Sequence, residues 1–317
     1  MKSKINMPKI LISDSLDDIC ANIFKKNNIE VDTITDLNSD ELKKIINNYD
    51  GLVVRSATKA TEEIITNAKK LKIIGRAGAG VDNIDLIAAK KNNVIVMNTP
   101  GGNTNATAEH ALSLLISLYK NIPEANESTH KGLWEKKKFK GFELKGKNIG
   151  IIGFGNVGKR LSEISLSLDM NVFVYSESFE SRKLEFPNIS SISLSKIISE
   201  SDIISFHCKP PKDGKPIISY NELKSMKKNA VLINTARGNL IDENDLKKAL
   251  NENIIRGAAL DVYSDEPAKN NILFGTKNLI LTPHIAASTY EAQIVVAKQI
   301  AEQICNYFNT GEIINSV

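Results

Sequence analysis

Short apolar runs alternate with helical segments along the chain, and the series begins twice. The first series comprises the runs at 9–13, 51–54, 72–75 and 93–98, and the second those at 148–153, 172–175, 202–207, 230–235, 257–262 and 278–284. Apolar runs of this length between helices are typical of parallel strands joined by crossover helices. We therefore predict an α/β protein with two doubly wound parallel sheets, the second of about six strands.

Two long helical patterns, at 105–122 and 288–308, flank the second series. They indicate that the chain leaves a first lobe near residue 100 and returns to it near residue 290. We expect Ser288 and Glu291 to form a capping box at the start of the second helix, and Ser39 to cap an earlier one.

The segment GIIGFGNVGKRL contains a glycine-rich loop between an apolar run and a helix. Gly153, Gly155 and Gly158 match the G-x-G-x-x-G pattern of dinucleotide-binding units. The first glycine permits a tight turn, the second a close approach to the pyrophosphate, and the third close packing of helix and strand. The amides of Asn156 and Val157 would face the phosphates. We predict a dinucleotide site here, the alternative being a glycine-rich turn without ligand.

A second glycine-rich segment, GRAGAGVDNID at 75–85, does not have this spacing. Glycine amides in such a loop can form a nest for an anion. We expect it to approach an anionic substrate rather than a second nucleotide.

The segment VFVYSES lacks an acid at the strand tip, where dinucleotide-binding units usually place one for the adenosine ribose. Ser176 stands there and Glu177 follows. Selection of NADP would also need positive charge for the 2′-phosphate, and Arg182 and Lys183 reach it only if the turn folds back. We expect NAD as the cofactor, with use of NADP possible.

Three polar residues follow successive strands of the second series: Arg237 in NTARG, Glu266 in DVYSDEP and His284 after NLILTP. Hydride transfer at a hydroxyl carbon needs an acid/base, a holder for the substrate carboxylate and a carboxylate that keeps the base in one tautomer. Histidine, arginine and glutamate suit these tasks. Each residue alone also fits an ordinary loop, but together at one sheet edge they favour this chemistry.

The other histidines carry weaker signals. His110 lies in an apolar helical pattern and is expected to be a packed core residue. His207 ends a strand and is expected near the cofactor as a packing neighbour, while His130 has no signal.

The motifs GIIGFGNVG, NTARG, GAALDVYSDEP and PHIAAST resemble those of the D-isomer-specific 2-hydroxyacid dehydrogenases, in the same order and over nearly the whole chain. The resemblance implies a flavodoxin-like substrate-binding domain at 1–100 and 290–317 and a Rossmann NAD(P)-binding domain at 101–289. It also implies His284 as acid/base, Glu266 as its partner, and Arg237 as holder of the substrate carboxylate and carbonyl. Expected cofactor contacts are Gly153, Gly155, Asn156, Val157, Gly158, Ser176, Glu177, Cys208, Thr235, Ala236, Asp261, Ala286 and Ala287.

Within the family, VRSATK, GRAGAGVDNID, VMNTPGGNTNATAEH and GLWEKKKFKGFELKGK resemble one subgroup. That subgroup acts on a small phosphorylated 2-hydroxy or keto acid. The resemblance implies substrate contacts at Arg55, Ser56, Ala79, Gly80, Asn103, Lys136, Arg237 and His284. Ala79 stands where a hydroxyl residue often touches the cofactor, so the chain departs from the pattern there.

The lysine-rich segment 131–147 has three readings. Lysines with aromatic residues between them can form a nucleic-acid face, which the small net charge of the chain does not support. The other two are a solvated loop, and a surface that packs on a partner subunit and brings Lys136 toward its substrate. The family implies a homodimer through the second lobe, and the apolar helix 105–122 supports it. Longer members of the subgroup carry regulatory domains after this region, and we expect none here. A reductase of unphosphorylated hydroxypyruvate or glyoxylate remains an alternative, and a dinucleotide-sensing corepressor a remote one.

Composition narrows the partners further. The net charge of +4 over 317 residues gives no reason to expect nucleic acid or a membrane. The three cysteines are far apart and neither they nor the histidines cluster, so we expect a cytoplasmic location and no metal. The apolar run ILI near the start is too short for a signal peptide, and the residues before it are expected to be a disordered tip.

Overall fold

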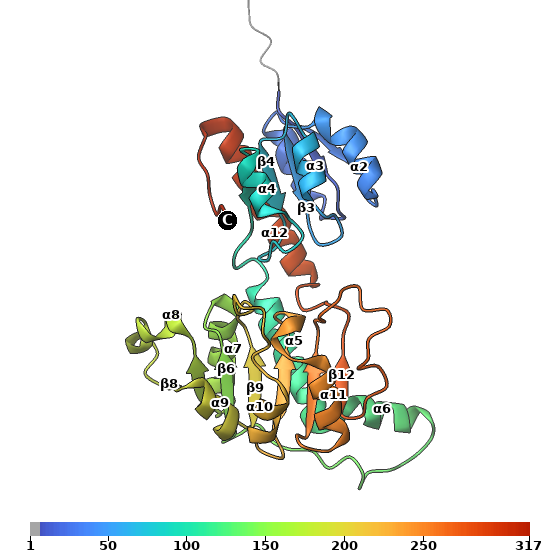
Figure 1. The fold of residues 1–317 in the computed structure, drawn as a ribbon, viewed down its shortest axis with the longest axis vertical. Coiled ribbons are helices and arrows are strands. Elements are labelled where there is room, and N and C mark those ends of the chain that lie inside the picture. The colour runs from blue at the N-terminus through green and yellow to red at the C-terminus, as the bar shows by residue number, and fades with distance from the viewer. Residues whose placement is uncertain (1–6) are drawn as a thin grey trace, which may run out of the picture. The chain divides into compact units, whose positions relative to one another are not determined.

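The computed structural model describes residues 7–317, so the tip predicted at 1–6 lies outside the described residues. The chain divides into two compact units (Figure 1). Unit 1 is formed by the chain up to Asn103 together with Ser288–Val317, and unit 2 by Thr104–Ala287.

Unit 1 contains a five-stranded parallel sheet in the order β2-β1-β3-β4-β5, counted over the described residues. The strands are β1 (Lys9–Ile12), β2 (Glu30–Thr33), β3 (Gly51–Val54), β4 (Ile73–Arg76) and β5 (Ile95–Met97). The helices are α1 (Ile19–Lys26), α2 (Ser39–Ile45), α3 (Glu62–Asn67), α4 (Leu86–Lys91) and α12 (Tyr290–Thr310), with a 3-10 turn η1 at Ile46–Asn48. This strand order is the flavodoxin-like one.

Each face of this sheet carries its own core, because side chains alternate along a strand. On β1, Leu11 packs with residues of α2, α3 and α4, whereas Ile10 and Ile12 pack with residues of α1 and α12. The C-terminal helix α12 thus completes unit 1 although it is remote in sequence.

Unit 2 contains a seven-stranded parallel sheet in the order β12-β11-β10-β9-β6-β7-β8 (Figure 1). The strands are β6 (Asn148–Ile152), β7 (Asn171–Tyr175), β8 (Ile189–Ser191), β9 (Ile203–Phe206), β10 (Val231–Asn234), β11 (Gly257–Leu260) and β12 (Leu279–Leu281). The helices are α5 (Thr104–Lys120), α6 (Ile122–His130), α7 (Asn156–Ser167), α8 (Glu177–Glu180), α9 (Leu194–Glu200), α10 (Tyr220–Ser225) and α11 (Glu243–Asn251), with 3-10 turns η2 (Lys183–Glu185) and η3 (Gly238–Leu240). This is the Rossmann order with one further strand.

The prediction of two doubly wound parallel sheets is confirmed, with one strand more in each sheet than expected. The additional strands are β2, with the sequence EVDT, and β8, with the sequence ISS. Both are edge strands with few apolar residues, so the apolar pattern that revealed the other strands is absent.

The predicted helix starts at Ser39 and Ser288 are wrong by one residue. The side chain of Asn38 caps α2 in a capping box with Glu41. The side chain of Thr289 caps α12 by accepting a hydrogen bond from the Ala292 amide. Neighbouring Ser, Thr and Asn residues can all cap, so sequence alone does not choose between them.

The apolar face of α5 is buried inside unit 2. Leu114, Leu115 and Leu118 belong to the core that covers β6, β9 and β10 on one face of the sheet, and α7 joins them there. The apolar pattern of this helix is thus explained within unit 2 and gives no separate support for the homodimer, which stays a prediction. Within residues 7–317, no helix combines the length and the apolar character needed to cross a membrane.

Candidate active site

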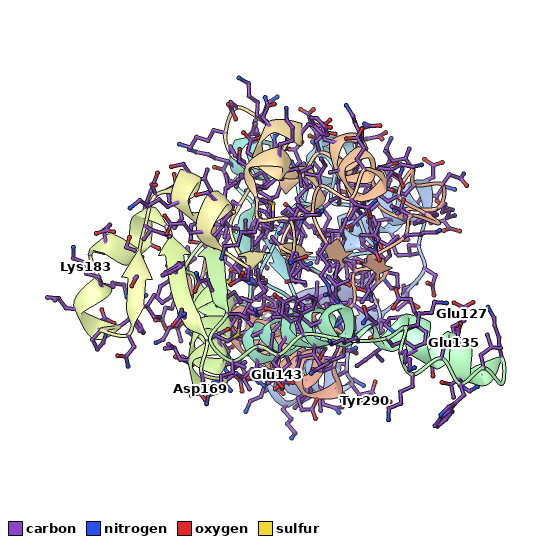
Figure 2. All side chains as sticks on the ribbon, turned by 90° about the horizontal axis from the view of Figure 1, so that it is seen from below. Glu127, Glu135, Glu143, Asp169, Lys183 and Tyr290 are labelled. Carbon is purple, nitrogen blue, oxygen red and sulfur yellow. The ribbon has the colours of Figure 1, made fainter. Side chains whose placement is uncertain are left out.

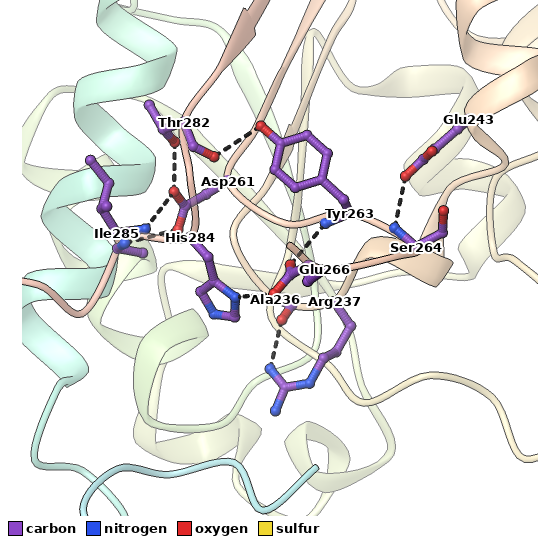
Figure 3. Close-up of polar contacts among 11 residues, drawn as sticks. Ala236, Arg237, Glu243, Asp261, Tyr263, Ser264, Glu266, Thr282, His284 and Ile285 are labelled. Carbon is purple, nitrogen blue, oxygen red and sulfur yellow. Dashed lines mark hydrogen bonds and ion pairs between the residues drawn. The ribbon is translucent and has the colours of Figure 1, made fainter. Parts of the chain in front are cut away.

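Three loops at the carboxyl edge of the large sheet carry the predicted catalytic residues. Arg237 follows β10, Glu266 follows β11 and His284 follows β12. These three strands are neighbours and run parallel, so their ends meet at one edge. Figure 3 shows the three side chains gathered in one group.

His284 and Glu266 form a direct pair. The Nδ1 of His284 lies 2.6 Å from Oε2 of Glu266, whose Oε1 accepts a hydrogen bond of 3.0 Å from the Tyr263 amide. Because a carboxylate accepts, Nδ1 carries the proton and Nε2 remains for another partner. The His284 side chain is 49% exposed, so a ligand can reach it.

The pair shifts both pKa values in the directions that acid/base chemistry needs. The hydrogen bond to Glu266 raises the pKa of His284 above its ordinary 6.5, although partial burial opposes this. Partial burial by itself would raise the pKa of Glu266, but hydrogen bonds from His284 and the Tyr263 amide outweigh it and keep the pKa low. Glu266 therefore stays ionised and favours the charged imidazole.

A buried carboxylate holds the turn that presents His284. Asp261 is fully buried; its Oδ1 accepts hydrogen bonds from the Ile285 amide at 2.8 Å and the Thr282 hydroxyl at 2.6 Å, and its Oδ2 one from the Ala286 amide at 2.8 Å. His284 has a left-handed φ of 53°, which is uncommon for a non-glycine residue. The two amides that follow it are thus fixed by Asp261 (Figure 3).

Burial alone would raise the pKa of Asp261, but the hydrogen bonds from His110, Thr282 and the two amides outweigh it and lower the pKa. The group is therefore an anion inside the protein. Both carboxylate oxygens of Asp261 already accept hydrogen bonds within the turn. The predicted contact between Asp261 and a cofactor stays a prediction.

Sequence reasoning missed His110 and Thr282 in this network. The Nε2 of His110 on α5 lies 3.1 Å from Oγ1 of Thr282 and 3.4 Å from Oδ1 of Asp261. His110 is largely buried, as expected, but its ring also takes part in a polar network. Tyr263 supports the same turn by donating its hydroxyl to the Thr282 carbonyl at 2.9 Å. The one sequence signal for this network was the presence of a histidine, His110, within an otherwise apolar helix.

The surroundings of His207 disfavour its charged form. Burial lowers its pKa to about 3, and its Nε2 lies 2.8 Å from the Ser205 hydroxyl. His207 lies beside the glycine-rich loop, as expected for a packing neighbour of the cofactor site. If residue 153 had a Cβ atom, that atom would lie 2.4 Å from the His207 carbonyl oxygen.

The NTARG turn is held by the side chain of Asn234 and packs against the backbone at Tyr263. Asn234 donates to the Arg237 carbonyl at 2.8 Å and accepts from the Ala236 amide at 3.0 Å. A Cβ at Gly238 would lie 1.8 Å from the Tyr263 carbonyl carbon, so only glycine lets the turn approach the loop that carries Glu266. The Arg237 guanidinium donates to the Ala236 carbonyl at 2.6 Å.

The three glycines of the β6–α7 loop have different reasons to be glycine. Gly153 has a φ of 96°, and a Cβ at Gly158 would lie 2.2 Å from the Gly153 carbonyl oxygen. Gly155 has an ordinary φ of −77° and, among the described residues, nothing within 4 Å of its Cβ position. The protein itself gives no reason for glycine at 155, whereas a ligand close to the backbone does.

The residues beside this loop also fit a cofactor. Thr235, Ala236 and Cys208 directly follow or nearly follow the carboxyl ends of β10 and β9. The Thr235 hydroxyl is buried and has no hydrogen-bond partner among the described residues. Such a group calls for a partner, and a bound dinucleotide could supply one.

Residues 112–286 match the model of the NAD-binding domain of D-isomer specific 2-hydroxyacid dehydrogenases. The match covers more than half of the chain, and its end includes Arg237, Glu266 and His284. The chain belongs to the D-isomer specific 2-hydroxyacid dehydrogenase family.

Individual proteins resemble the chain in sequence and in structure. The D-3-phosphoglycerate dehydrogenase of Archaeoglobus fulgidus is 39% identical over 310 residues, which make up 98% of this chain and 59% of that protein. The chain therefore spans little more than half the length of this relative. The structure of NAD⁺-bound 3-phosphoglycerate dehydrogenase of Entamoeba histolytica is 31% identical, with a TM-score of 0.82 and 98% of both chains covered. An acyclic imino acid reductase solved with NADPH and D-Arg is 31% identical, with a TM-score of 0.86 and 98% and 99% covered.

At the ribose end, the polar contacts around Ser176 and the nearby cations are short-range and exposed. The Ser176 hydroxyl lies 3.0 Å from that of Ser178. Arg182 pairs with Glu185 at 3.2 Å and Lys183 with Glu180 at 3.4 Å, both as i,i+3 pairs on the surface. None of these contacts joins Arg182 or Lys183 to Ser176. The residue next to Ser176 is the acidic Glu177, which begins α8.

The substrate residues that the family resemblance assigned to the first lobe lie in unit 1. Arg55 is half-buried and Ser56 exposed, just after β3. Asp14, which sequence reasoning missed, accepts hydrogen bonds from the Arg55 amide at 2.5 Å, the Thr58 amide at 3.0 Å and the Thr58 hydroxyl at 2.6 Å. A buried carboxylate thus holds the loop that presents Arg55 and Ser56.

The remaining assigned residues are placed less tightly. Ala79 and Gly80 lie after β4, where the Ala79 carbonyl accepts a hydrogen bond of 2.6 Å from Asn98. Asn103 is half-buried at the end of the first stretch of unit 1. Lys136 is exposed and stands outside the Arg237, Glu266 and His284 group. It follows α6, which extends beyond the rest of unit 2, and the neighbouring Glu135 marks its place in Figure 2.

Proposed function

We propose that this chain is an NAD-dependent dehydrogenase that oxidises 3-phospho-D-glycerate to 3-phosphohydroxypyruvate, the first step of serine biosynthesis. The His284–Glu266 pair beside Arg237 is the observation that carries the chemistry. The substrate is supported by the 39% identity to the Archaeoglobus enzyme over 98% of the chain.

The residues divide the work by charge and position. Nε2 of His284 takes the proton of the substrate hydroxyl, and Glu266 stabilises the imidazolium that results. Arg237 makes charge-assisted hydrogen bonds to the substrate carboxylate. Bound NAD would accept the hydride from C2, so that the alcohol loses one hydride and one proton and becomes a ketone. In the reverse direction His284 returns the proton to the carbonyl oxygen.

The cofactor would lie along the β6–α7 loop. Its pyrophosphate would face the amides of Asn156 and Val157 at the start of α7, beside the open space at Gly155. Thr235, Ala236, Cys208, Ala286 and Ala287 remain predicted contacts for the rest of the molecule. We propose NAD rather than NADP because Glu177 adjoins the ribose position and Arg182 is paired with Glu185.

The phosphate of the substrate decides between this function and a related one. We would compare kcat/KM for 3-phosphohydroxypyruvate, hydroxypyruvate and glyoxylate, each with NADH. The proposal expects at least a hundredfold preference for the phosphorylated acid. Equal or better turnover of hydroxypyruvate or glyoxylate would make the chain a reductase of those acids, and no turnover at all would favour a dinucleotide-sensing role.

We also propose a cytoplasmic homodimer. Leu133 and Trp134, just after α6, have 48% and 86% of their surface exposed. Apolar side chains this exposed on an extending segment suit a protein interface. Sedimentation of the wild type should give a dimer and Trp134→Ala should weaken it; a monomeric wild type would end this proposal.

A further inference from the structure

Unit 2 contains a second feature of interest, a pocket separate from the candidate active site. It has a volume of about 180 Å³ and is lined by Tyr119, Phe142, Lys147, Asp202, Lys227, Lys228 and Asn229. Lys147 directly precedes β6, Asp202 directly precedes β9, and Asn229 comes shortly before β10. The pocket therefore lies at the amino edge of the sheet, whereas Arg237, Glu266 and His284 lie at its carboxyl edge. Glu143, next to Phe142, is labelled on this side in Figure 2.

Two aromatic rings contribute to the apolar lining of the pocket: Phe142 is half-buried, and Tyr119 is almost completely buried. The rings of Tyr119 and Phe142 lie 5.9 Å apart, tilted by 45°. The Phe142 amide donates to the Tyr119 carbonyl at 2.9 Å. A Cβ at Gly141 would lie 2.6 Å from that carbonyl oxygen, so glycine allows the approach. The Arg256 guanidinium covers the Phe142 ring at 4.0 Å.

The remaining lining is positively charged. Lys147, Lys227 and Lys228 contribute three cations, against the single carboxylate of Asp202. Asp202 is already engaged, since its Oδ1 accepts from Lys227 at 3.0 Å and its Oδ2 from the Asn148 amide at 2.9 Å. The lining therefore keeps a net positive charge, which attracts anions.

We propose that this pocket is a binding site for a small phosphate monoester with a flat apolar group. The apolar group would lie against the half-buried Phe142, because Tyr119 behind it is only 3% exposed. The phosphate would face Lys147 and Lys228. The volume suits a small ligand, since pockets for drug-sized molecules are about 300–1,000 Å³. The site is separate from the dehydrogenase chemistry, because it lies at the opposite edge of the sheet.

Phenyl phosphate is the probe that combines both features. At pH 8 it is a dianion, because the second pKa of a phosphate monoester is about 6. Titration calorimetry on the full chain at low salt should show saturable binding, weaker binding of inorganic phosphate, and none of phenol. The double variant Lys147→Ala/Lys228→Ala should bind the probe at least tenfold more weakly. Lys227 is left intact because it pairs with Asp202.

Controls separate this site from others on the chain. Lys140→Ala/Lys145→Ala removes the same charge from the same segment outside the lining and should leave the affinity unchanged. Lys147→Ala/Lys228→Ala should keep the wild-type kcat/KM and melting temperature, which separates the pocket from the active site. If that variant is unstable, Lys228→Ala alone should still weaken binding.

Three results would contradict the proposal. One is equal affinity of Lys147→Ala/Lys228→Ala and the wild type for phenyl phosphate. Another is binding of phenol as tight as that of the ester, which would leave only an apolar crevice. The third is equal affinity for inorganic phosphate and the ester, which would remove the aromatic part of the assignment.

Discussion

The two ends of the candidate cofactor region in unit 2 are built differently. Around His284, hydrogen bonds join α5 and the loops after β11 and β12, and Asp261 at their centre is fully buried. Around Ser176, the polar contacts are exposed: the hydroxyl pair of Ser176 and Ser178, the i,i+3 ion pairs, and a hydrogen bond from Ser191 to Glu180. Buried charged networks are costly to disturb, whereas exposed ion pairs contribute little. Substitutions should therefore have large effects at the first end and small ones at the second.

The largest effect is expected for His284→Asn. Loss of a positioned acid/base lowers turnover about 10²- to 10⁴-fold. Steady-state kcat with 3-phosphohydroxypyruvate and NADH measures it, and His130→Asn on exposed α6 serves as the control. Near wild-type kcat for His284→Asn would mean that another group transfers the proton.

Asp261→Asn should test the support of the turn. The substitution replaces a carboxylate oxygen by an NH₂ group, which would face the hydrogen-bond donors of Thr282, Ile285 and Ala286. It should lower the free energy of unfolding by about 2 kcal/mol. Urea unfolding measures this, and Asp169→Asn at an exposed pair with Lys145 should change it by less than about 0.5 kcal/mol. Equal stability of both variants would show that the turn does not depend on Asp261.

Glu266→Gln should change the pH dependence of activity and lower kcat roughly tenfold. Glu266 raises the pKa of His284, so its loss lowers that pKa. Ketone reduction needs protonated His284 and declines as pH rises through this pKa, so the decline should begin at lower pH in the variant. Alcohol oxidation needs neutral His284, and its rise should also move to lower pH. Profiles of kcat/KM in both directions measure this; Asp265→Asn in the same loop should leave them unchanged.

The smallest effect is expected for Arg182→Ala at the ribose end. Because Arg182 already pairs with Glu185 on the surface, kcat/KM for NADPH should change by less than about twofold. Lys183→Ala is the matched control. A large loss with NADPH in Arg182→Ala alone would show that the arginine turns toward a 2′-phosphate. A wild type that prefers NADPH would overturn the assignment of NAD as the cofactor.

The same contrast explains which parts of the fold could be predicted. Buried central strands such as β6 and β9 have apolar runs that are visible in the sequence. The edge strands β2 and β8 do not, because backbone pairing rather than apolar burial places them. The long helices α5 and α12 were predicted, but the caps at Asn38 and Thr289 depend on which of several polar neighbours reaches the free amides.

The chain order of strands, turns and polar residues by itself determined that Arg237, Glu266 and His284 would come together, because the ends of parallel neighbouring strands must meet at one edge. Only the tertiary structure decided how they are held. His110 and Thr282 are 172 residues apart, and no local pattern predicts that they meet beside Asp261. A buried carboxylate takes its partners from whatever donors the fold brings within reach, and those come from distant parts of the chain.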